Sequence, residues 1–341
     1  MTASLGTPFP VVEQSLGEVL ASLGAYTAVV SDPPWSDIAG KVPAPVRVVR
    51  AGAMDIDSLT RMAIQEDAGE TVVGIGGGSA LDTAKFLAWR QGKPLVQAPT
   101  ITSVDAVFTD AIGVRVENKV RYVGKIAPRL VVLDLPLIRS APRRLNRAGI
   151  GDILSCHTGL FDWKLAADAG EGHPWSADLA ALGHNLLSEM EAVIEDVNAV
   201  NDEGVRFLAR AYRQIGAACA FVGHSRFEEG SEHFWAYAYE AATGVQQIHG
   251  ELIACGVVAL SVIQDNDPDW AAALVSRSGA RAHPGDLGLG RDAFAAALLG
   301  LSTYARAENL DYSIADTRVI GEADVAAAWA AVCALPRRNL D

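Results

Sequence analysis

The chain has 341 residues, of which half are hydrophobic and one fifth are charged, and its formal net charge is −13. This length predicts two domains with a sizeable core each, and the composition is that of a folded protein rather than a disordered one. Nucleic acids and anionic membrane surfaces bind clustered lysine and arginine, so the acidic balance argues against both as main partners.

The N-terminus and the cysteines indicate a cytoplasmic protein. There is no apolar run long enough to span a membrane, and Met1–Pro10 lacks the basic and apolar regions of a signal peptide. The four cysteines are far apart and form no C-x-x-C pair: Cys156, Cys219, Cys255 and Cys333. We therefore expect reduced thiols rather than disulfides or a structural zinc site.

In chain order, the N-terminal part alternates β-branched runs with amphipathic stretches. The pattern predicts helices at 11–23, 56–68 and 79–90, and strands at 26–31, 45–49, 71–75, 94–98 and 130–133. A turn is expected at Asp32-Pro33-Pro34 and a hairpin at 114–122. The β-α order predicts a Rossmann-like parallel sheet with helices on both faces, which is an α/β dinucleotide-binding domain.

The C-terminal part is predicted to be all helical. Helices are expected at 152–169, 176–197, 202–222, 231–242, 250–264, 291–306 and 322–335. We place the boundary between an α/β NAD-binding domain, residues 1–149, and an all-α metal- and substrate-binding domain, residues 150–341. A small-molecule site is expected in the cleft between the two domains, where such sites are common.

The glycine run after strand 71–75 is a candidate phosphate site. Gly76-Gly77-Gly78-Ser79 opens a predicted helix that also carries Asp82 and Lys85. Glycines let the backbone approach a pyrophosphate, and the helix N-terminus supplies N–H groups and a positive dipole. A tight turn without a ligand is the alternative, although a turn does not need three successive glycines. Thr100 and Ser103 follow the next strand, at the same carboxyl edge of the sheet.

Asp32, at the end of the first predicted strand, is a candidate ribose ligand. Acidic residues at this position of NAD sites accept hydrogen bonds from ribose hydroxyls and repel a 2′-phosphate. An Asx-turn before Pro33 is the alternative interpretation. The ribose role predicts NAD(H) as the cofactor, with NADP as the second possibility.

Two histidines and one aspartate of the helical part form a candidate metal site. Asp152 lies at a predicted helix start, and His233 and His249 are 16 residues apart, which allows one helix and a turn between them. A carboxylate with two imidazoles is a common open ligand set for a divalent catalytic ion. A helix cap for Asp152 and ordinary polar contacts for the histidines are the alternatives. Three further histidines compete for the ligand role: His157, His184 and His224.

Five motifs, in this order, resemble the iron-containing alcohol dehydrogenase and dehydroquinate synthase superfamily. They are GGGS-x-x-D-x-x-K, P-T-x-x-S-x-D, G-D-x-x-S, S-E-H and H-G-E. Within that superfamily the chain is most similar to the glycerol-1-phosphate dehydrogenases of archaea and bacteria, notably where G-D-x-x-S is followed by D-W-x-L at Asp162-Trp163. The resemblance covers residues 20–265, with a weaker similarity at 306–313.

The resemblance implies a role for each matching residue. The metal ligands would be Asp152, His233 and His249. The nicotinamide dinucleotide would be bound by Gly76, Gly77, Gly78, Ser79, Asp82, Thr100, Ser103 and Thr109. Asp105 would contact substrate hydroxyls near the metal, and with the three ligands it makes up the catalytic set.

Two positions depart from the family pattern near the substrate. The family usually has glycine after the substrate-binding aspartate, where this chain has Ala106, and a second histidine four residues after the first histidine ligand, where it has Tyr237. Tyr237 would contact the substrate, as Asp152 would, but without a charge. A phosphate would then need other cations, and the candidates are Lys125, Arg121 and Arg226, each with a solvated surface charge as the alternative.

Together these features predict a metal-dependent NAD(P)(H) oxidoreductase that interconverts a polyol or polyol phosphate and its ketone. Zinc is the expected ion, with iron, nickel and manganese as alternatives. A sugar-phosphate cyclase of the dehydroquinate synthase type, which uses NAD transiently, is the alternative enzyme. A catalytically silent nucleotide-binding protein is a third possibility. We expect a homo-oligomer, a dimer or larger, and no nucleic-acid or membrane partner.

Overall fold

The computed structural model describes residues 10–65, 69–103, 105–117 and 119–339, and its backbone contacts divide the chain into two units. The first unit contains the described residues of Met1–Pro142 together with Tyr212–Val222. The second contains Arg143–Ala211 and the described residues of Gly223–Asp341. Helix α10 (Asp202–Val222) therefore has its N-terminal half in the second unit and its C-terminal half in the first.

The first unit is built on a six-stranded sheet in which every pair of neighbouring strands is parallel. The strand order is β1 (Val11–Glu13), β8 (Leu130–Leu133), β5 (Leu95–Pro99), β4 (Thr71–Gly76), β2 (Tyr26–Val30) and β3 (Arg47–Arg50). The helices of this part are α1 (Leu16–Ser22), α2 (Asp32–Ile38), α3 (Ile56–Gln65), α4 (Gly78–Gln91) and α5 (Leu135–Ser140). Parallel strands need such crossover connections. The predicted Rossmann-like α/β region is confirmed.

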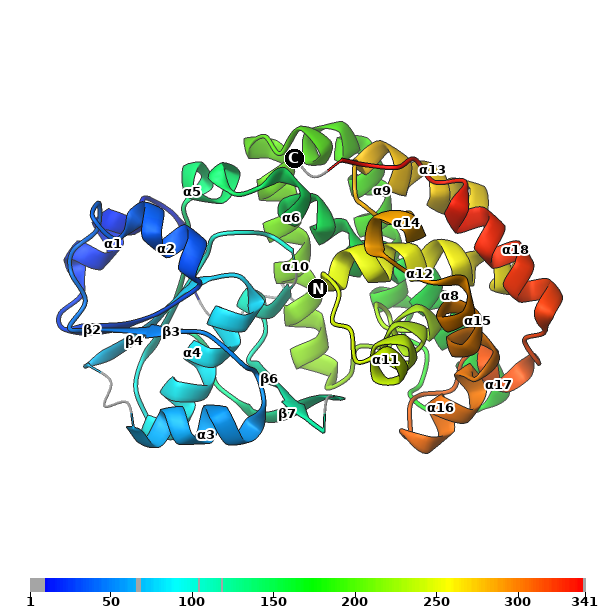
Figure 1. The fold of residues 1–341 in the computed structure, drawn as a ribbon, viewed down its shortest axis with the longest axis horizontal. Helices are drawn as coiled ribbons and strands as arrows, with labels where there is room; N and C mark the ends of the chain where they lie inside the picture. Colours follow the sequence, from blue (N-terminus) through cyan, green and yellow to red (C-terminus); the bar gives the residue numbers. More distant parts are fainter. Residues whose placement is uncertain (1–9, 66–68, 104, 118, 340–341) are drawn as a thin grey trace. The chain divides into compact units, whose positions relative to one another are not determined.

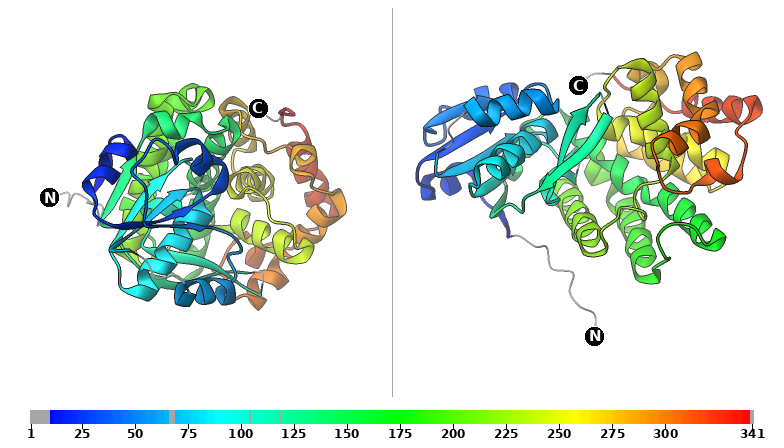
Figure 2. Two further views of the ribbon diagram at one scale, coloured as in Figure 1. Left: turned by 60° about the vertical axis from the view of Figure 1, so that its left-hand side comes forward. Right: turned by 90° about the horizontal axis from the view of Figure 1, so that it is seen from below.

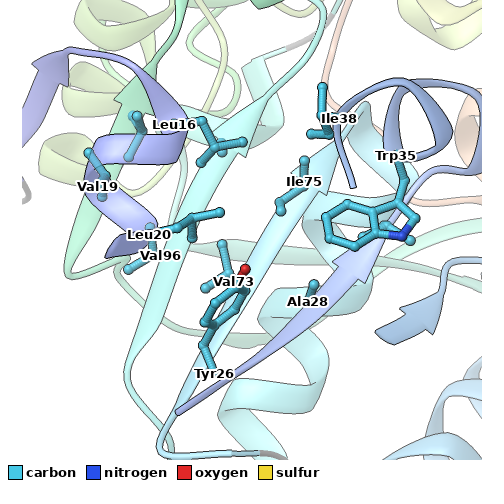
Figure 3. Packing of buried hydrophobic residues seen from close by; sticks show 13 residues of the cluster. Leu16, Val19, Leu20, Tyr26, Ala28, Trp35, Ile38, Val73, Ile75 and Val96 are labelled. Carbon is cyan, nitrogen blue, oxygen red and sulfur yellow. The ribbon is translucent and has the colours of Figure 1, made fainter. Parts of the chain in front are cut away.

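Helices cover both faces of the sheet, with α1 and α2 on one side and α3 and α4 on the other (Figure 1). Successive side chains of a strand point to opposite faces, so β4 contributes to two cores. Val73 and Ile75 belong to the core that also contains Leu20 of α1 and Ile38 of α2 (Figure 3), whereas Val72 belongs to the core that contains Leu87 of α4. Because both faces are apolar, the strands are nearly continuous hydrophobic runs, as in other parallel sheets.

A two-stranded antiparallel hairpin, β6 (Ala111–Val116) and β7 (Lys119–Lys125), stands apart from the sheet (Figure 2). The short 3-10 helix η1 (Asp105–Phe108) precedes it. Ile112 and Val114 of β6 pack against Leu59 of α3 and Phe86 of α4. The predicted hairpin is confirmed, and its Asn118 lies outside the described residues.

The predicted helix over 11–23 is wrong for its first residues. Val11–Glu13 form β1, and Val11 pairs with Val131, because two adjacent valines favour an extended chain beside a strand. The helix starts only at Leu16, whose N–H donates to Asp134 Oδ2 at 2.9 Å. The turn expected at Asp32-Pro33-Pro34 is instead the first turn of α2, where proline is well tolerated.

Two expectations touch residues that are not described. Helix α3 ends at Gln65, so the end predicted at Ala68 lies outside the described residues. The same holds for nearly all of the segment examined for a signal peptide, residues 1–9. Among the described residues, the helices are too short or too polar to cross a membrane.

All elements in the described part of the second unit are helical. After α6 (Arg143–Arg147) and the 3-10 helix η2 (Ala148–Ile150) come α7 (Gly151–Leu154), α8 (Cys156–Ala169), α9 (Ala177–Ala199), α11 (Ser231–Thr243), α12 (His249–Gln264), α13 (Pro268–Ser278), α14 (Pro284–Leu287), α15 (Arg291–Leu299), α16 (Leu301–Ala307), α17 (Ile314–Thr317) and α18 (Glu322–Cys333). Helix α12 is buried almost throughout and packs against α7, α11, α13 and α18 (Figure 1). A helix that is apolar on every side belongs at the centre of such a unit.

The second unit differs from the predicted helices in several places. The stretch 291–306 is divided at Gly300 into α15 and α16, and the short helices α6, α14 and α17 were not predicted. The stretch 152–169 is divided at Ser155 into α7 and α8, and the Ser155 hydroxyl donates to the backbone oxygens of Asp152 and Glu228. Helix α13 was not predicted. Its signal is a capping aspartate before proline, since Asp267 accepts a hydrogen bond from Trp270 N and Pro268 is the first helical residue.

Gly216 of α10 gives a test of packing in the first unit. A Cβ at this position would lie 2.3 Å from the backbone oxygen of Phe108 in η1. We expect Gly216→Ala to lower the free energy of unfolding by about 1–3 kcal/mol, measured by urea denaturation. Gly17→Ala on α1 is the control, because its new Cβ would have no neighbour closer than 3.6 Å. An equal loss of stability in both variants would contradict this account.

Candidate functional site

Asp152, His233 and His249 come together in the second unit. Asp152 lies on α7, His233 in the first turn of α11, and His249 is the first residue of α12. The Nε2 atoms of His249 and His233 are 3.2 and 3.8 Å from Asp152 Oδ1, and the two imidazole centroids are 5.3 Å apart. One potential ligand atom from each of the three side chains lies within 4.8 Å of the other two. No other group of three acidic, histidine or cysteine side chains in the described part of the chain meets this criterion.

This donor set fits a divalent cation. Asp152 and His233 are buried, and Asp152 Oδ1 has no hydrogen-bond partner among the described residues. A buried carboxylate oxygen without a donor is costly unless a cation satisfies it. One carboxylate and two imidazoles supply three ligands and leave positions open for water or substrate, as in catalytic rather than structural metal sites.

Glu232 orients the imidazole of His233. Glu232 is fully buried, its Oε1 lies 2.8 Å from His233 Nδ1, and it also accepts a hydrogen bond from Gly230 N at 2.8 Å. With Nδ1 donating to this carboxylate, Nε2, which faces Asp152, is the nitrogen whose lone pair would bind a metal ion. No role was predicted for Glu232, although a carboxylate directly before a candidate ligand histidine is a usable signal.

The carboxylates around the imidazoles make the pocket favourable for positive charge. Burial lowers the pKa of His233, but the hydrogen bond and charge of Glu232, with the charges of Glu229 and Asp152, outweigh burial and raise this pKa to about 9. Burial raises the pKa of Asp152, yet His249 and His233 together lower it below its usual value. The same field that holds a proton on His233 stabilises a metal ion in its place.

Tyr237 lies one turn after His233 on the same face of α11. The two ring centroids are 5.9 Å apart, and the Tyr237 hydroxyl donates to Glu229 Oε1 at 2.7 Å. Ser225 donates to the other oxygen of the same carboxylate at 2.5 Å. Glu229, which was not among the predicted site residues, therefore fixes the hydroxyl of a residue predicted to contact the substrate.

The three competing histidines have other environments. His157 Nε2 lies 2.6 Å from the backbone oxygen of Asn266, and the ring of His224 stacks on that of His173 at a centroid distance of 4.1 Å. His184 is exposed on α9. None of the three belongs to the converging group formed by the described residues.

Arg226 is not the solvated surface charge that was the alternative to a phosphate ligand. Its side chain is 2% exposed, and its guanidinium donates to the backbone oxygens of Tyr312 at 2.7 Å and Glu229 at 3.3 Å. The charge is therefore used inside the second unit. Lys125, by contrast, is 68% exposed and lies 3.5 Å from Asp110 in the first unit.

In the first unit, the glycine run lies where β4 ends and α4 begins, with Ser79 as the second residue of the helix. Gly76 has a φ of +155°, and a Cβ on it would lie 2.3 Å from Ser31 Oγ. A Cβ on Gly77 would lie 2.8 Å from Ile101 Cδ1, and no side chain caps the helix that Gly78 opens. Close backbone approach at a helix N-terminus is the geometry that a pyrophosphate requires.

Three further candidates for the cofactor site lie near the carboxyl ends of the strands. The N–H of Thr100 donates to Gly76 O at 3.0 Å, and Thr100 and Ser103 are buried just after β5. Asp32 is the first residue of α2, directly after β2. Its Oδ1 lies 2.6 Å from Arg50 Nε, and both side chains are largely exposed.

Asp82 and Thr109 make contacts that hold the hairpin. The carboxylate of Asp82 lies 3.2 Å from Lys85 Nζ and accepts a hydrogen bond from the backbone of Gly113. Burial raises the pKa of this carboxyl group, although the charge of Lys85 acts to lower it. The Thr109 hydroxyl accepts a hydrogen bond from Ala111 N at 3.1 Å. Asp105 opens η1. The cofactor and substrate roles of these residues stay predictions.

This arrangement has counterparts among known proteins. Residues 34–142 match the family described as iron-containing alcohol dehydrogenase. A glycerol-1-phosphate dehydrogenase [NAD(P)+] from Sulfurisphaera tokodaii is 34% identical over 223 residues, 64% of this chain and 63% of that protein. One from Pyrobaculum islandicum is 31% identical over 259 residues, 74% and 69% of the two chains. The chain belongs to the iron-containing alcohol dehydrogenase family.

Solved structures of the family share the fold. A probable glycerol dehydrogenase from Sinorhizobium meliloti superposes with a TM-score of 0.72 at 21% identity, over 96% of this chain and 97% of that one. The predicted family, and its fold of an α/β region followed by helices, are thus confirmed. The aligned part spans just under two thirds of the Sulfurisphaera tokodaii relative.

Gly151 tests how the site is assembled. A Cβ at Gly151 would lie 2.4 Å from Gly250 O, so this glycine lets α7 approach α12 and brings Asp152 beside His249. We expect Gly151→Ala to weaken zinc binding about tenfold or more, measured by competition with a chromophoric chelator. Gly290→Ala is the control in the same unit, because its new Cβ would have no neighbour within 4 Å. Parent-like zinc affinity in Gly151→Ala would show that the close approach is unimportant.

Proposed function

We propose that this chain is a metal-dependent NAD(P)(H) oxidoreductase that interconverts a polyol or polyol phosphate and its ketone, with a glycerol-1-phosphate dehydrogenase-like activity. The observation that carries the proposal is the convergence of Asp152, His233 and His249 in a chain that also has an open glycine turn at a helix N-terminus. The names of the two relatives above, which give a glycerol-1-phosphate dehydrogenase and NAD(P)+, support the same reaction class.

The metal would be held by Asp152, His233 and His249, with Glu232 fixing the imidazole of His233. A divalent ion bound there supplies Lewis-acid polarisation of an alcohol or carbonyl oxygen. We propose zinc, because one carboxylate and two imidazoles form a donor set of borderline softness, and iron, nickel or manganese are the alternatives.

The remaining residues would bind and orient the reactants. The Tyr237 hydroxyl donates a hydrogen bond to Glu229, which would fix its orientation toward the substrate. The carboxylate of Asp105 would accept from neighbouring hydroxyls. The N-terminal turn of α4, at Gly76–Ser79, would hold the pyrophosphate of the dinucleotide, and Asp32 its adenosine ribose.

The proposed binding roles are divided between the two predicted domains. We propose that residues 1–149 bind NAD(H), that residues 150–341 bind the metal and the substrate, and that water is excluded during hydride transfer. A homo-oligomer, a dimer or larger, and a cytoplasmic location remain part of the proposal.

Steady-state kinetics with dihydroxyacetone phosphate, dihydroxyacetone and NADH test the reaction. The parent is expected to oxidise NADH with one of these ketones, while His249→Ala keeps its fold but loses most of its metal and nearly all activity, because one of three ligands is gone. His184→Ala, which removes an exposed histidine, is the control and should keep both. Consumption of a sugar phosphate without net change in nicotinamide absorbance would instead support the cyclase.

Cofactor preference tests the role of Asp32. A carboxylate at this edge repels a 2′-phosphate, so we propose that NADH is preferred over NADPH. Asp32→Ser removes that repulsion and frees Arg50 from its 2.6 Å ion pair, and should raise kcat/KM for NADPH relative to NADH by about tenfold. Asp37→Ser, at an exposed position of the same helix, is the control. If the parent protein already prefers NADPH, the proposed contact of Asp32 with the adenosine ribose is wrong.

A further inference from the structure

Two buried side chains of opposite charge hold the segment before α11 to a segment much later in the chain. Asp162 and Arg226 are 0% and 2% exposed, and both contact residues 229–231 and 312–314. We propose that Asp162 and Arg226 form a clamp that positions α11, and with it His233 and Tyr237, for metal and substrate binding. This inference rests on the function proposed above and adds two positioning residues to it.

Asp162, on α8, joins the first residues of two helices. Its Oδ2 accepts a hydrogen bond from Ser231 N at 2.7 Å, where α11 begins, and its Oδ1 accepts one from Ile314 N at 2.7 Å, where α17 begins. The first N–H groups of a helix have no partner within the helix, so one ionised side chain satisfies a buried donor in each. Removing it would leave both donors unpaired.

Arg226 makes the complementary contacts with the same two segments. Its Nη2 donates to Tyr312 O at 2.7 Å and its Nη1 to Glu229 O at 3.3 Å. In each segment, the carbonyl group bound by the guanidinium lies two residues before the N–H group that donates to Asp162. A carboxylate on N–H groups and a guanidinium on carbonyl groups fix the relative position of the two segments more strictly than either contact alone.

The clamped segment carries the groups that orient the site. Glu229 accepts the Tyr237 hydroxyl, and Gly230 N donates to Glu232, whose other contact is the imidazole of His233. A Cβ at Gly230 would lie 2.7 Å from Asp162 Oδ2 and 3.0 Å from Glu232 Oε2, so there is little free space around this turn. A shift of the turn therefore moves Glu232, His233 and Tyr237 together.

The clamp also accounts for two sequence features that had no role. Asp162 is the first residue of the D-W-x-L motif, and Tyr312 and Ser313 end the short region of weaker family resemblance near 306–313. Both stretches contribute to the environment of α11, although they are separated by about 150 residues in the chain.

Cobalt binding to the full chain tests the clamp, because the absorption spectrum of bound Co²⁺ reports the ligand geometry independently of activity. Asp162→Asn keeps the shape of the side chain but replaces one acceptor oxygen with an amide group. We expect the cobalt dissociation constant to rise about 10- to 100-fold, and the spectrum of the bound ion to change.

Asp134→Asn is the matched control. The carboxylate of Asp134 also accepts hydrogen bonds from two separate elements, at Leu16 N (2.9 Å) and Leu137 N (3.1 Å), but in the first unit. If carboxylates that bridge two elements act only on global stability, the two variants should affect cobalt binding alike. We expect a parent-like cobalt affinity and spectrum for Asp134→Asn even where its Tm falls as far as that of Asp162→Asn.

Parent-like cobalt affinity and spectrum in Asp162→Asn would overturn the inference. Should that variant not fold, Arg226→Lys replaces it, since one ammonium group on a shorter side chain cannot reach both carbonyl groups in the same geometry. An altered cobalt spectrum in Arg226→Lys supports the clamp and an unchanged one overturns it. A parent chain that binds no cobalt would overturn the proposed function first, so the two failures are distinguishable.

Discussion

The burial of one carboxylate beside two imidazoles is the constraint on which the second unit depends. Asp152 is buried, and one of its oxygens has no hydrogen-bond partner among the described residues, which is costly unless positive charge compensates it. The three side chains come from three helices, so their meeting requires close packing of α7, α11 and α12. Gly151 and the almost completely buried α12 provide that packing, and Glu232 supplies the orientation of His233. The stability of the helices and the chemistry of the site are therefore linked.

The features that the sequence predicted well depend on neighbouring residues. Strand β4, the glycine run and α4 follow directly from one another, so a β-branched run, three glycines and a helical pattern were sufficient. Asp152, His233 and His249 were harder to select, because the seven histidines and many carboxylates of the chain offer similar chemistry. Their selection came from motif order and family resemblance, and the structure brings these three together.

The features that the sequence did not reveal depend on partners far along the chain. Val11–Glu13 has the length of one helical turn, and only its pairing with β8, about 120 residues later, makes it a strand. An arginine in a polar loop has the pattern of a surface charge, and only the carbonyl groups of Glu229 and Tyr312 explain why Arg226 is buried. Tertiary contacts overrode local preference at these positions.

The assignment of α10 to both units has a consequence for how the chain acquires its fold during synthesis. The packing of Gly216 against Phe108 belongs to the first unit, yet it needs residues translated about 100 positions later. When only the first 142 residues have left the ribosome, the nascent chain still exposes the surface that the C-terminal half of α10 later covers. The N-terminal α/β unit therefore cannot be completed as a contiguous fragment, and a gene truncated at that boundary would encode a partial fold.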